Sequence, residues 1–227
     1  MTPDWWKRCL AELIGTFALT FVGAASICTN QYSGGEVGLL GIAIAHGLVL
    51  AIMVTATGHV SGGHINPAVT LGVLLSGAIR PAMAVIYVIS QLLGAALAGL
   101  LLVRTFAAEV WLPVQLGTPS LGASVAFSTG VYIETVLTFL LVFTVLQVAI
   151  DERAPKNVYG FAIGLVLVFD ILVGGPLTGA AMNPARAFGP ALAAGVWTNH
   201  LVYWIGPAIG AVLAAVAAAL LRADASG

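Results

Sequence analysis

The chain has 227 residues, of which 60% are hydrophobic and only 7% are charged, and its formal net charge is −1. Soluble domains carry about 25% charged residues, and a mean hydropathy of +1.05 leaves more apolar surface than a soluble fold of this size can bury. The composition therefore excludes a soluble globular domain, and we expect no nucleic-acid partner. Long uncharged windows favour membrane-spanning helices over the short alternating strands of a membrane barrel.

Six membrane spans are predicted in chain order. The charged start "MTPDWWKRCLAEL" leads into an apolar segment that runs past residue 27 without a signal-peptidase site, so we interpret it as a retained first span. Together the windows predict an all-α membrane protein with spans at residues 7–28, 38–58, 82–103, 126–149, 157–174 and 200–221.

Two uncharged runs are too long for one span each. Residues 37–79 would form a helix about 65 Å long, whereas the hydrocarbon core of a bilayer is about 30 Å thick. Within this run, "SGGHINPAVT" predicts a return at residues 59–65, an N-cap at Asn66 and a half-helix from Pro67 to about residue 77. The run 187–221 divides in the same way, with Asn183 as cap and Pro184 opening a half-helix to about residue 194.

The sequence contains an internal repeat with two copies. Three pairs of segments occur in the same order: "ELIGTF" with "ETVLTF", "SGGHINPAV" with "TGAAMNPAR", and "QLLGAALA" with "PAIGAVLA". We therefore predict a single channel domain over residues 1–227, with a first repeat at 1–110 and a second at 120–227. Three spans per repeat is an odd number, so the second repeat enters from the opposite face, which is an inverted repeat.

Basic residues indicate the orientation. With the N-terminus inside, only Arg104 lies at an outer end, which satisfies the positive-inside rule. We expect a multi-pass protein of the cell membrane, plasma or bacterial inner, with both termini in the cytoplasm. The six basic residues at cytoplasmic ends are then Lys7, Arg8, Arg80, Arg153, Lys156 and Arg222.

The half-helices predict a wet passage. Irregular backbone at membrane depth is tolerated where it lines a cavity, and each Asn side chain is expected to keep its NH₂ free to donate there. Glu12 and Glu134 are interpreted as acceptors for the backbone of the returning loops, and His64 as a brace of its loop or a pore-lining residue rather than a gate. As paired acids the glutamates could also serve proton relay or catalysis, but no nucleophile and base accompany them, so we expect no enzyme.

These motifs resemble the aquaporin (major intrinsic protein) family, whose two Asn-Pro-Ala boxes are matched here with Arg directly after the second. The resemblance implies a homotetramer in the lipid bilayer, one water pore per subunit, and no cofactor or metal. It also implies two control points along the pore. The first comprises Asn66, Pro67, Ala68, Asn183, Pro184 and Ala185, and the second, an aromatic/arginine constriction, comprises His46, Ile171, Ala180 and Arg186.

The constriction departs from the strict water-channel pattern, because His46 stands in the usual Phe place and Ile171 in the usual His place. This set is similar to tonoplast intrinsic proteins and aquaammoniaporins, which implies ammonia beside water, with urea or hydrogen peroxide as further candidates. Asp170, beside Ile171, has two interpretations: a packing role away from the pore, or an electrostatic effect on Arg186 or His46.

Other functions are weighed against a passive channel that excludes protons and ions. One is a glycerol or urea facilitator with little water permeability. Another is a coupled secondary transporter, since inverted repeats and broken helices occur there too. Such a transporter needs charged or ion-coordinating groups at the midplane, where this chain has amides.

Overall fold

A computed structural model describes residues 4–155 and 157–223. Within these residues, six helices are long and apolar enough to cross a membrane, as predicted. Compared with the predicted spans, the first helix is longer at both ends and the others differ by a few residues. They are α1 (Trp5–Tyr32), α2 (Gly38–Ser61), α4 (Pro81–Thr105), α6 (Phe127–Val145) with its π-helical extension η2 (Leu146–Ile150), α7 (Tyr159–Thr178) and α9 (Val202–Ala223).

The two half-helices are present as α3 (Pro67–Leu75) and α8 (Pro184–Ala194). The predicted end of the first at residue 77 is wrong by two residues, because Ser76 caps the helix and Gly77 turns to a φ of 79°. The predicted return at residue 59 also begins too early, because α2 continues to Ser61 and ends at Gly62 with a φ of 96°. Two short helical segments, α5 (Ala108–Trp111) and η1 (Gln115–Gly117), lie in the connection between α4 and α6.

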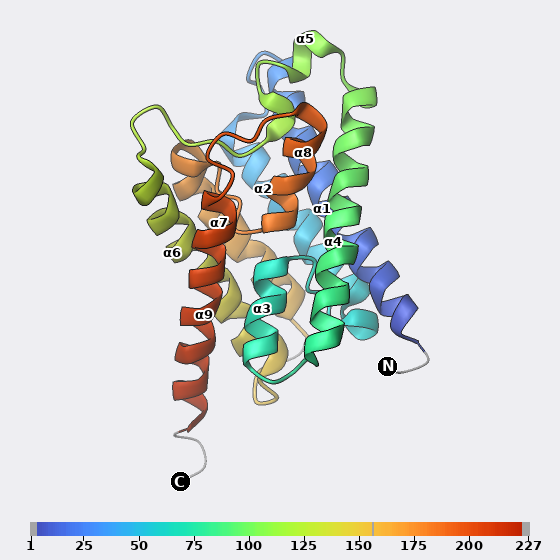
Figure 1. Cartoon of the computed structure of the whole chain (residues 1–227), viewed down its shortest axis with the longest axis vertical. Coiled ribbons are helices and arrows are strands. Elements are labelled where there is room, and N and C mark those ends of the chain that lie inside the picture. The colour runs from blue at the N-terminus through green and yellow to red at the C-terminus, as the bar shows by residue number, and fades with distance from the viewer. Residues whose placement is uncertain (1–3, 156, 224–227) are drawn as a thin grey trace.

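The half-helices approach each other from opposite ends of the bundle (Figure 1). α3 occupies the lower half of the view and α8 the upper half, and both ends of the chain lie at the bottom. α1 packs on α2 and α4, α6 packs on α7 and α9, and α2 packs on α7. Each half therefore contributes three long helices and one half-helix, in the aquaporin-like arrangement that the repeat predicts.

Equivalent glycines allow the long helices of each half to cross closely. A Cβ at Gly94 on α4 would lie 3.1 Å from the backbone N of Phe17 on α1, and one at Gly210 on α9 would lie 2.9 Å from the backbone N of Phe139 on α6. Small residues at such crossings let helix backbones approach in a membrane.

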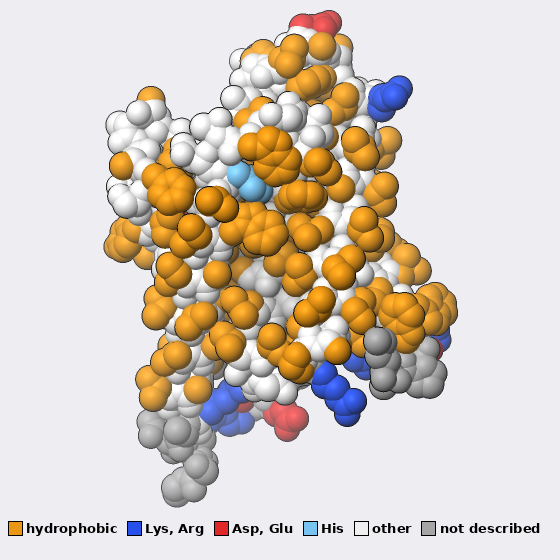
Figure 2. Space-filling view, in the orientation of Figure 1, with side chains coloured by type: hydrophobic (Ala, Val, Ile, Leu, Met, Phe, Trp, Pro, Cys, Tyr) orange, Lys and Arg blue, Asp and Glu red, His pale blue; other side chains and the backbone are white. Residues whose placement is uncertain are grey.

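The outer surface suits lipid. Hydrophobic side chains cover the flank of the molecule, and most Lys and Arg side chains in this view gather at the end where the termini lie (Figure 2). Among the basic residues assigned to cytoplasmic ends, Lys156 lies outside the described residues.

Candidate functional site

The two Asn-Pro-Ala boxes open the half-helices through the same local contacts. Asn66 Oδ1 accepts a hydrogen bond from the backbone N–H of Ala68 at 2.8 Å. Asn183 Oδ1 accepts from the backbone N–H of Ala185 at 3.0 Å and of Arg186 at 3.2 Å. Pro67 and Pro184 each occupy the first helical turn, where a missing N–H costs nothing. The predicted caps are therefore present.

The asparagine amides also cross between the halves. Asn66 Nδ2 donates to the carbonyl oxygen of Met182, and Asn183 Nδ2 donates to that of Ile65, both at 2.9 Å. The expectation that the NH₂ groups are wholly free is therefore wrong, because one N–H of each fastens the opposite loop. An amide carries two N–H donors, so within the described structure the second is available to the cavity.

The residues that present those carbonyls have a strained backbone. Ile65 has a φ of 57° and Met182 a φ of 50°, in the left-handed region that L-residues avoid at a cost of roughly 1–2 kcal/mol each. Such conformations persist where surrounding contacts hold them. Here a buried glutamate holds each loop.

Glu134 on α6 binds the second loop. Its carboxylate accepts from the backbone N–H of Ala181 at 3.0 Å, from that of Met182 at 2.7 Å and from the Thr178 hydroxyl at 2.7 Å. Tyr203 adds a hydrogen bond from its hydroxyl to the Thr178 carbonyl. The side chain of Glu134 is fully buried, so the N–H groups of the loop satisfy a carboxylate that water does not reach.

Glu12 on α1 binds the first loop in the equivalent way. It accepts from the backbone N–H of His64 at 2.9 Å, from that of Ile65 at 2.6 Å and from the Ser61 hydroxyl at 2.7 Å. The hydroxyl of Tyr87 donates to the Ser61 carbonyl, as Tyr203 does in the other half. The two glutamates thus perform the loop contacts that we predicted.

The first half carries an additional polar bracket that the second half lacks among its equivalent residues. Gln91 Nε2 donates to Glu12 at 2.8 Å and to the Thr70 hydroxyl at 2.9 Å, and His64 Nδ1 lies 3.2 Å from that hydroxyl. In the second half the positions equivalent to His64, Thr70 and Gln91 are Ala181, Ala187 and Pro207. The structure therefore places His64 both on its loop and on the cavity wall.

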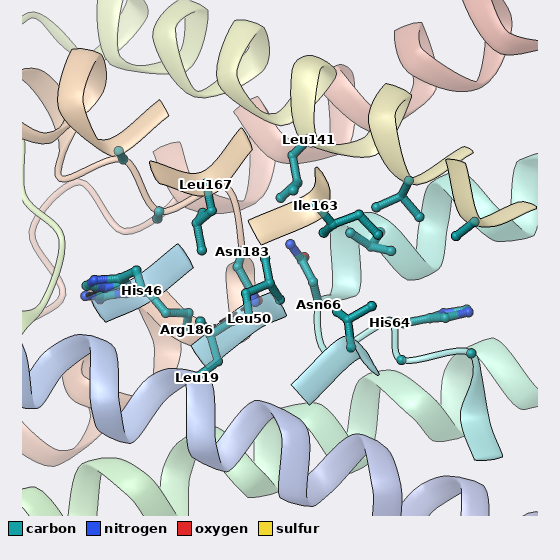
Figure 3. Close-up of a pocket in the computed structure, with 18 residues that line it drawn as sticks. Leu19, His46, Leu50, His64, Asn66, Leu141, Ile163, Leu167, Asn183 and Arg186 are labelled. Carbon is teal, nitrogen blue, oxygen red and sulfur yellow. Dashed lines mark hydrogen bonds between the residues drawn. The ribbon is translucent and has the colours of Figure 1, made fainter. Parts of the chain in front are cut away.

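A narrow cavity passes the junction of the two half-helices inside the bundle. Figure 3 shows His46 and Arg186 toward one end, Asn183 and Asn66 in the middle, and His64 toward the other end. Ala180 also lines this cavity. Most of the other lining residues are apolar, and they include Leu19, Leu50, Leu141, Val145, Ile163 and Leu167.

Arg186 and His46, two of the residues predicted to form the constriction, lie together on the cavity wall toward the end nearer α5. Arg186 is 3% exposed, its Nη1 donates to the carbonyl oxygen of Gly117 at 2.8 Å, and its Nη2 lies 3.1 Å from His46 Nε2. His46 Nδ1 lies 2.8 Å from the carbonyl oxygen of Ile42. A carbonyl only accepts, so Nδ1 carries the proton and Nε2 accepts from Arg186. Both imidazole nitrogens are therefore committed.

Gly23 on α1 makes room for this imidazole. A Cβ at Gly23 would lie 2.6 Å from His46 Cδ2, closer than real side chains approach. The sequence offered no sign of this contact, because Gly23 resembles any other small residue on an apolar helix. Gly117 was missed for a related reason, since it acts through its backbone carbonyl.

Substituting Gly23 by Ala is expected to displace His46 and break its hydrogen bond with Arg186. Overpacking of this kind costs about 1–3 kcal/mol, and the shifted ring obstructs the cavity, so water permeability falls as well. Stopped-flow permeability and thermal unfolding of the same preparation measure both effects. Gly41→Ala is the matched control, because its Cβ would meet only the side chain of Val37, the residue just before α2, and nothing at the cavity. Wild-type values for Gly23→Ala would contradict the assignment.

The other predicted constriction residue, Ile171, lies in the apolar core. It is 3% exposed on α7 and belongs to the buried cluster around the cavity, whereas the cavity lining next to Arg186 comes from His46 and Ala180. Its role at the constriction therefore stays a prediction.

Asp170 is fully buried beside Ile171. Among the described residues neither of its carboxylate oxygens has a hydrogen-bond partner. In the described part of the chain, the side-chain hydrogen bonds of Arg186 go to Gly117 and His46 and not to Asp170, which favours the packing interpretation of Asp170. Within residues 4–155 and 157–223, no three His, Cys, Asp or Glu side chains could hold a metal ion.

Comparisons with known proteins agree with this geometry. Aquaporin TIP4-4 from Zea mays is 49% identical over 214 residues, which cover 92% of this chain and 83% of that protein. Probable aquaporin TIP3-2 from Arabidopsis thaliana is 43% identical over 226 residues, covering 94% and 83%. The structure of the aquaglyceroporin from Plasmodium falciparum shares the fold with a TM-score of 0.81 at 23% identity, covering 93% and 94%. The family model described as major intrinsic protein matches residues 1–218, so the chain belongs to the major intrinsic protein, or aquaporin, family.

Proposed function

We propose that the chain is a passive transmembrane channel for water and small neutral solutes that excludes protons and ions. One observation carries the proposal: the cavity inside the bundle of six long helices is lined by the Arg186 guanidinium, the two asparagine amides and two histidines, and otherwise mostly by apolar side chains. The similarity to TIP-type aquaporins supports water as the main solute. The family consists of channels and not of enzymes.

Proton exclusion follows from the direction of the hydrogen bonds at the junction. The second N–H of Asn66 and of Asn183 donates to the oxygen of a passing water molecule. The hydrogens of that water therefore point away from the junction, toward the two ends of the cavity. A continuous chain of donors and acceptors, which proton hopping requires, is then interrupted. The N-termini of α3 and α8 also meet at this point, and their partial positive charges repel hydronium and metal cations.

Ion exclusion follows from the constriction and the walls. Arg186 brings a full positive charge to the cavity and offers donors that replace part of the hydration of water. The apolar walls give an ion nothing that replaces the water it would lose. A neutral water molecule loses much less on leaving bulk water and regains hydrogen bonds at these donors, so it crosses without an energy source or a conformational cycle.

We assign the constriction to His46, Ile171, Ala180 and Arg186 and propose ammonia as a second solute. Ammonia is about the size of water and both donates and accepts hydrogen bonds. The composition of the constriction supports this assignment.

Stopped-flow light scattering on proteoliposomes tests the function. We expect osmotic shrinkage several-fold faster than in empty vesicles, ammonia entry above background, and no proton current. Re-entry of glycerol or urea without faster shrinkage would favour a solute facilitator. A rate that saturates at low solute concentration, or that depends on an ion gradient, would favour a coupled transporter.

Substituting His46 by Phe tests the constriction. The larger ring narrows the mouth, so urea permeability should fall about tenfold more than water permeability, since one misfit of roughly 1.4 kcal/mol is a factor of ten. The same assay measures both. Equal losses for all solutes would contradict the assignment of His46.

We further propose that two repeats, residues 1–110 and 120–227, form one channel domain and that the protein is a homotetramer with one pore per subunit. The matching contacts of Glu12 with Glu134 and of Asn66 with Asn183 support the repeat. Native mass spectrometry tests the tetramer.

Both ends of the chain lie at the end of the molecule where most basic side chains gather, which supports cytoplasmic termini. Imaging a tagged chain decides between the cell membrane and the internal membrane that tonoplast-type relatives favour.

A further inference from the structure

The connection between α4 and α6 contains a turn with an unusual backbone. Three consecutive residues, Gln115, Leu116 and Gly117, have φ values of 50°, 56° and 69°. Two of them are not glycine, although L-residues visit this region rarely and mostly singly. Such a run persists only where other contacts hold it, and strained backbone of this kind is concentrated at functional sites.

Leu116 holds the turn in place. Its side chain is fully buried in a cluster with Ala24 and Cys28 of α1 and Leu102 of α4. Its neighbour Gln115 has the same backbone conformation but an exposed side chain. Burial of the Leu116 side chain therefore stabilises a left-handed turn that non-glycine residues disfavour.

The turn delivers a carbonyl to the constriction. Gly117 accepts from Arg186 Nη1 at 2.8 Å, and a Cβ at Gly117 would lie 3.0 Å from Ala24 Cα, so this backbone rests directly against α1. The opposite side of the guanidinium meets His46 at 3.1 Å. Arg186 is thus held between α2 and a turn whose position depends on Leu116.

We propose that Leu116 is a positioning residue for selectivity: by anchoring the turn 115–117, it fixes the guanidinium of Arg186 and so the width of the constriction. This inference rests on the proposed channel function. Without the anchor, the turn relaxes, the Gly117 carbonyl leaves Arg186, and the guanidinium yields to solutes larger than water.

The experiment measures the ratio of urea to water permeability in proteoliposomes. Leu116→Ala should raise this ratio by about tenfold or more, the effect of losing a hydrogen bond to a charged group. Gln115→Ala, which also truncates a side chain to Cβ on the same strained turn, should leave it unchanged, and Leu116→Met, which refills the cluster, should restore it. Gel filtration verifies folding, and Leu116→Val replaces the alanine variant if that does not fold.

A second background separates positioning from packing. If Leu116 acts through Arg186, adding Leu116→Ala to Arg186→Ala should not change the ratio further. The proposal is overturned if Leu116→Ala lowers urea and water permeability in proportion, or if its effect persists without Arg186. A wild-type protein that conducts no water would instead refute the channel function, so the two failures are distinct.

Discussion

Replacing Glu134 by alanine is expected to cause one of the two largest losses of stability among the substitutions considered. The variant leaves the backbone N–H groups of Ala181 and Met182 buried without their acceptor. Each orphaned donor costs about 1–3 kcal/mol, so the free energy of unfolding should fall by about 2–6 kcal/mol. The strained backbone of Met182 also loses its support. Thermal or denaturant unfolding in detergent measures the change.

Glu134→Gln provides the matched control for that experiment. The amide oxygen of glutamine still accepts from one of the two backbone N–H groups. Its NH₂ group cannot accept from the other, so we expect about half of the loss in the free energy of unfolding. The equivalent Glu12→Ala should be at least as damaging, because it also removes an acceptor from Gln91. An alanine variant as stable as wild type would show that the carboxylate does not hold the loop.

Replacing Arg186 by alanine is expected to have the largest effect on selectivity. A cation passing 4 Å from the guanidinium meets a repulsion of about 4 kcal/mol at an effective dielectric constant of about 20. Removing it could accelerate cation passage by up to about a thousandfold, since each 1.36 kcal/mol is tenfold. The positive helix ends at the junction remain, so the observed leak should be smaller. Proton and sodium fluxes into proteoliposomes measure it, alongside urea permeability.

Arg186→Lys separates the charge of this residue from its geometry. Lysine retains the positive charge but lacks the planar fork that reaches Gly117 and His46 together. The lysine variant should therefore still exclude cations while admitting more urea. If it leaks cations as the alanine variant does, the barrier resides in the positioned guanidinium and not in its charge.

The elements that are set by length and local chemistry could be predicted from the sequence. Two uncharged runs are longer than one helix needs to cross the bilayer, and Asn followed by Pro marks where each half-helix begins. The first residues of α3 and α8 could therefore be predicted. Glu12 and Glu134 were identifiable because a buried carboxylate needs donors, and the repeated loops provide them.

Contacts made by the backbone or by missing side chains could not be predicted. The carbonyls of Ile65 and Met182 claim one N–H of each asparagine, and nothing in a residue's identity reports where its carbonyl points. Gly117 acts through its backbone carbonyl and Gly23 through the space left by its missing side chain, and neither role can be recognised from the residue type. The left-handed turn at Gln115 and Leu116 opposes local preference, so only tertiary burial of Leu116 explains it.

The hydrogen bonds that the two asparagine side chains donate across the junction make the two halves dependent on each other. Asn66 closes the loop of the second half, and Asn183 closes that of the first, so neither half satisfies its own loop carbonyl with its own asparagine. An ancestral gene encoding half of this chain would therefore gain a complete junction only by assembling two copies with opposite orientation. Fusion of such copies would fix their stoichiometry and free each to diverge, as the bracket of Gln91, Thr70 and His64 in one half has done.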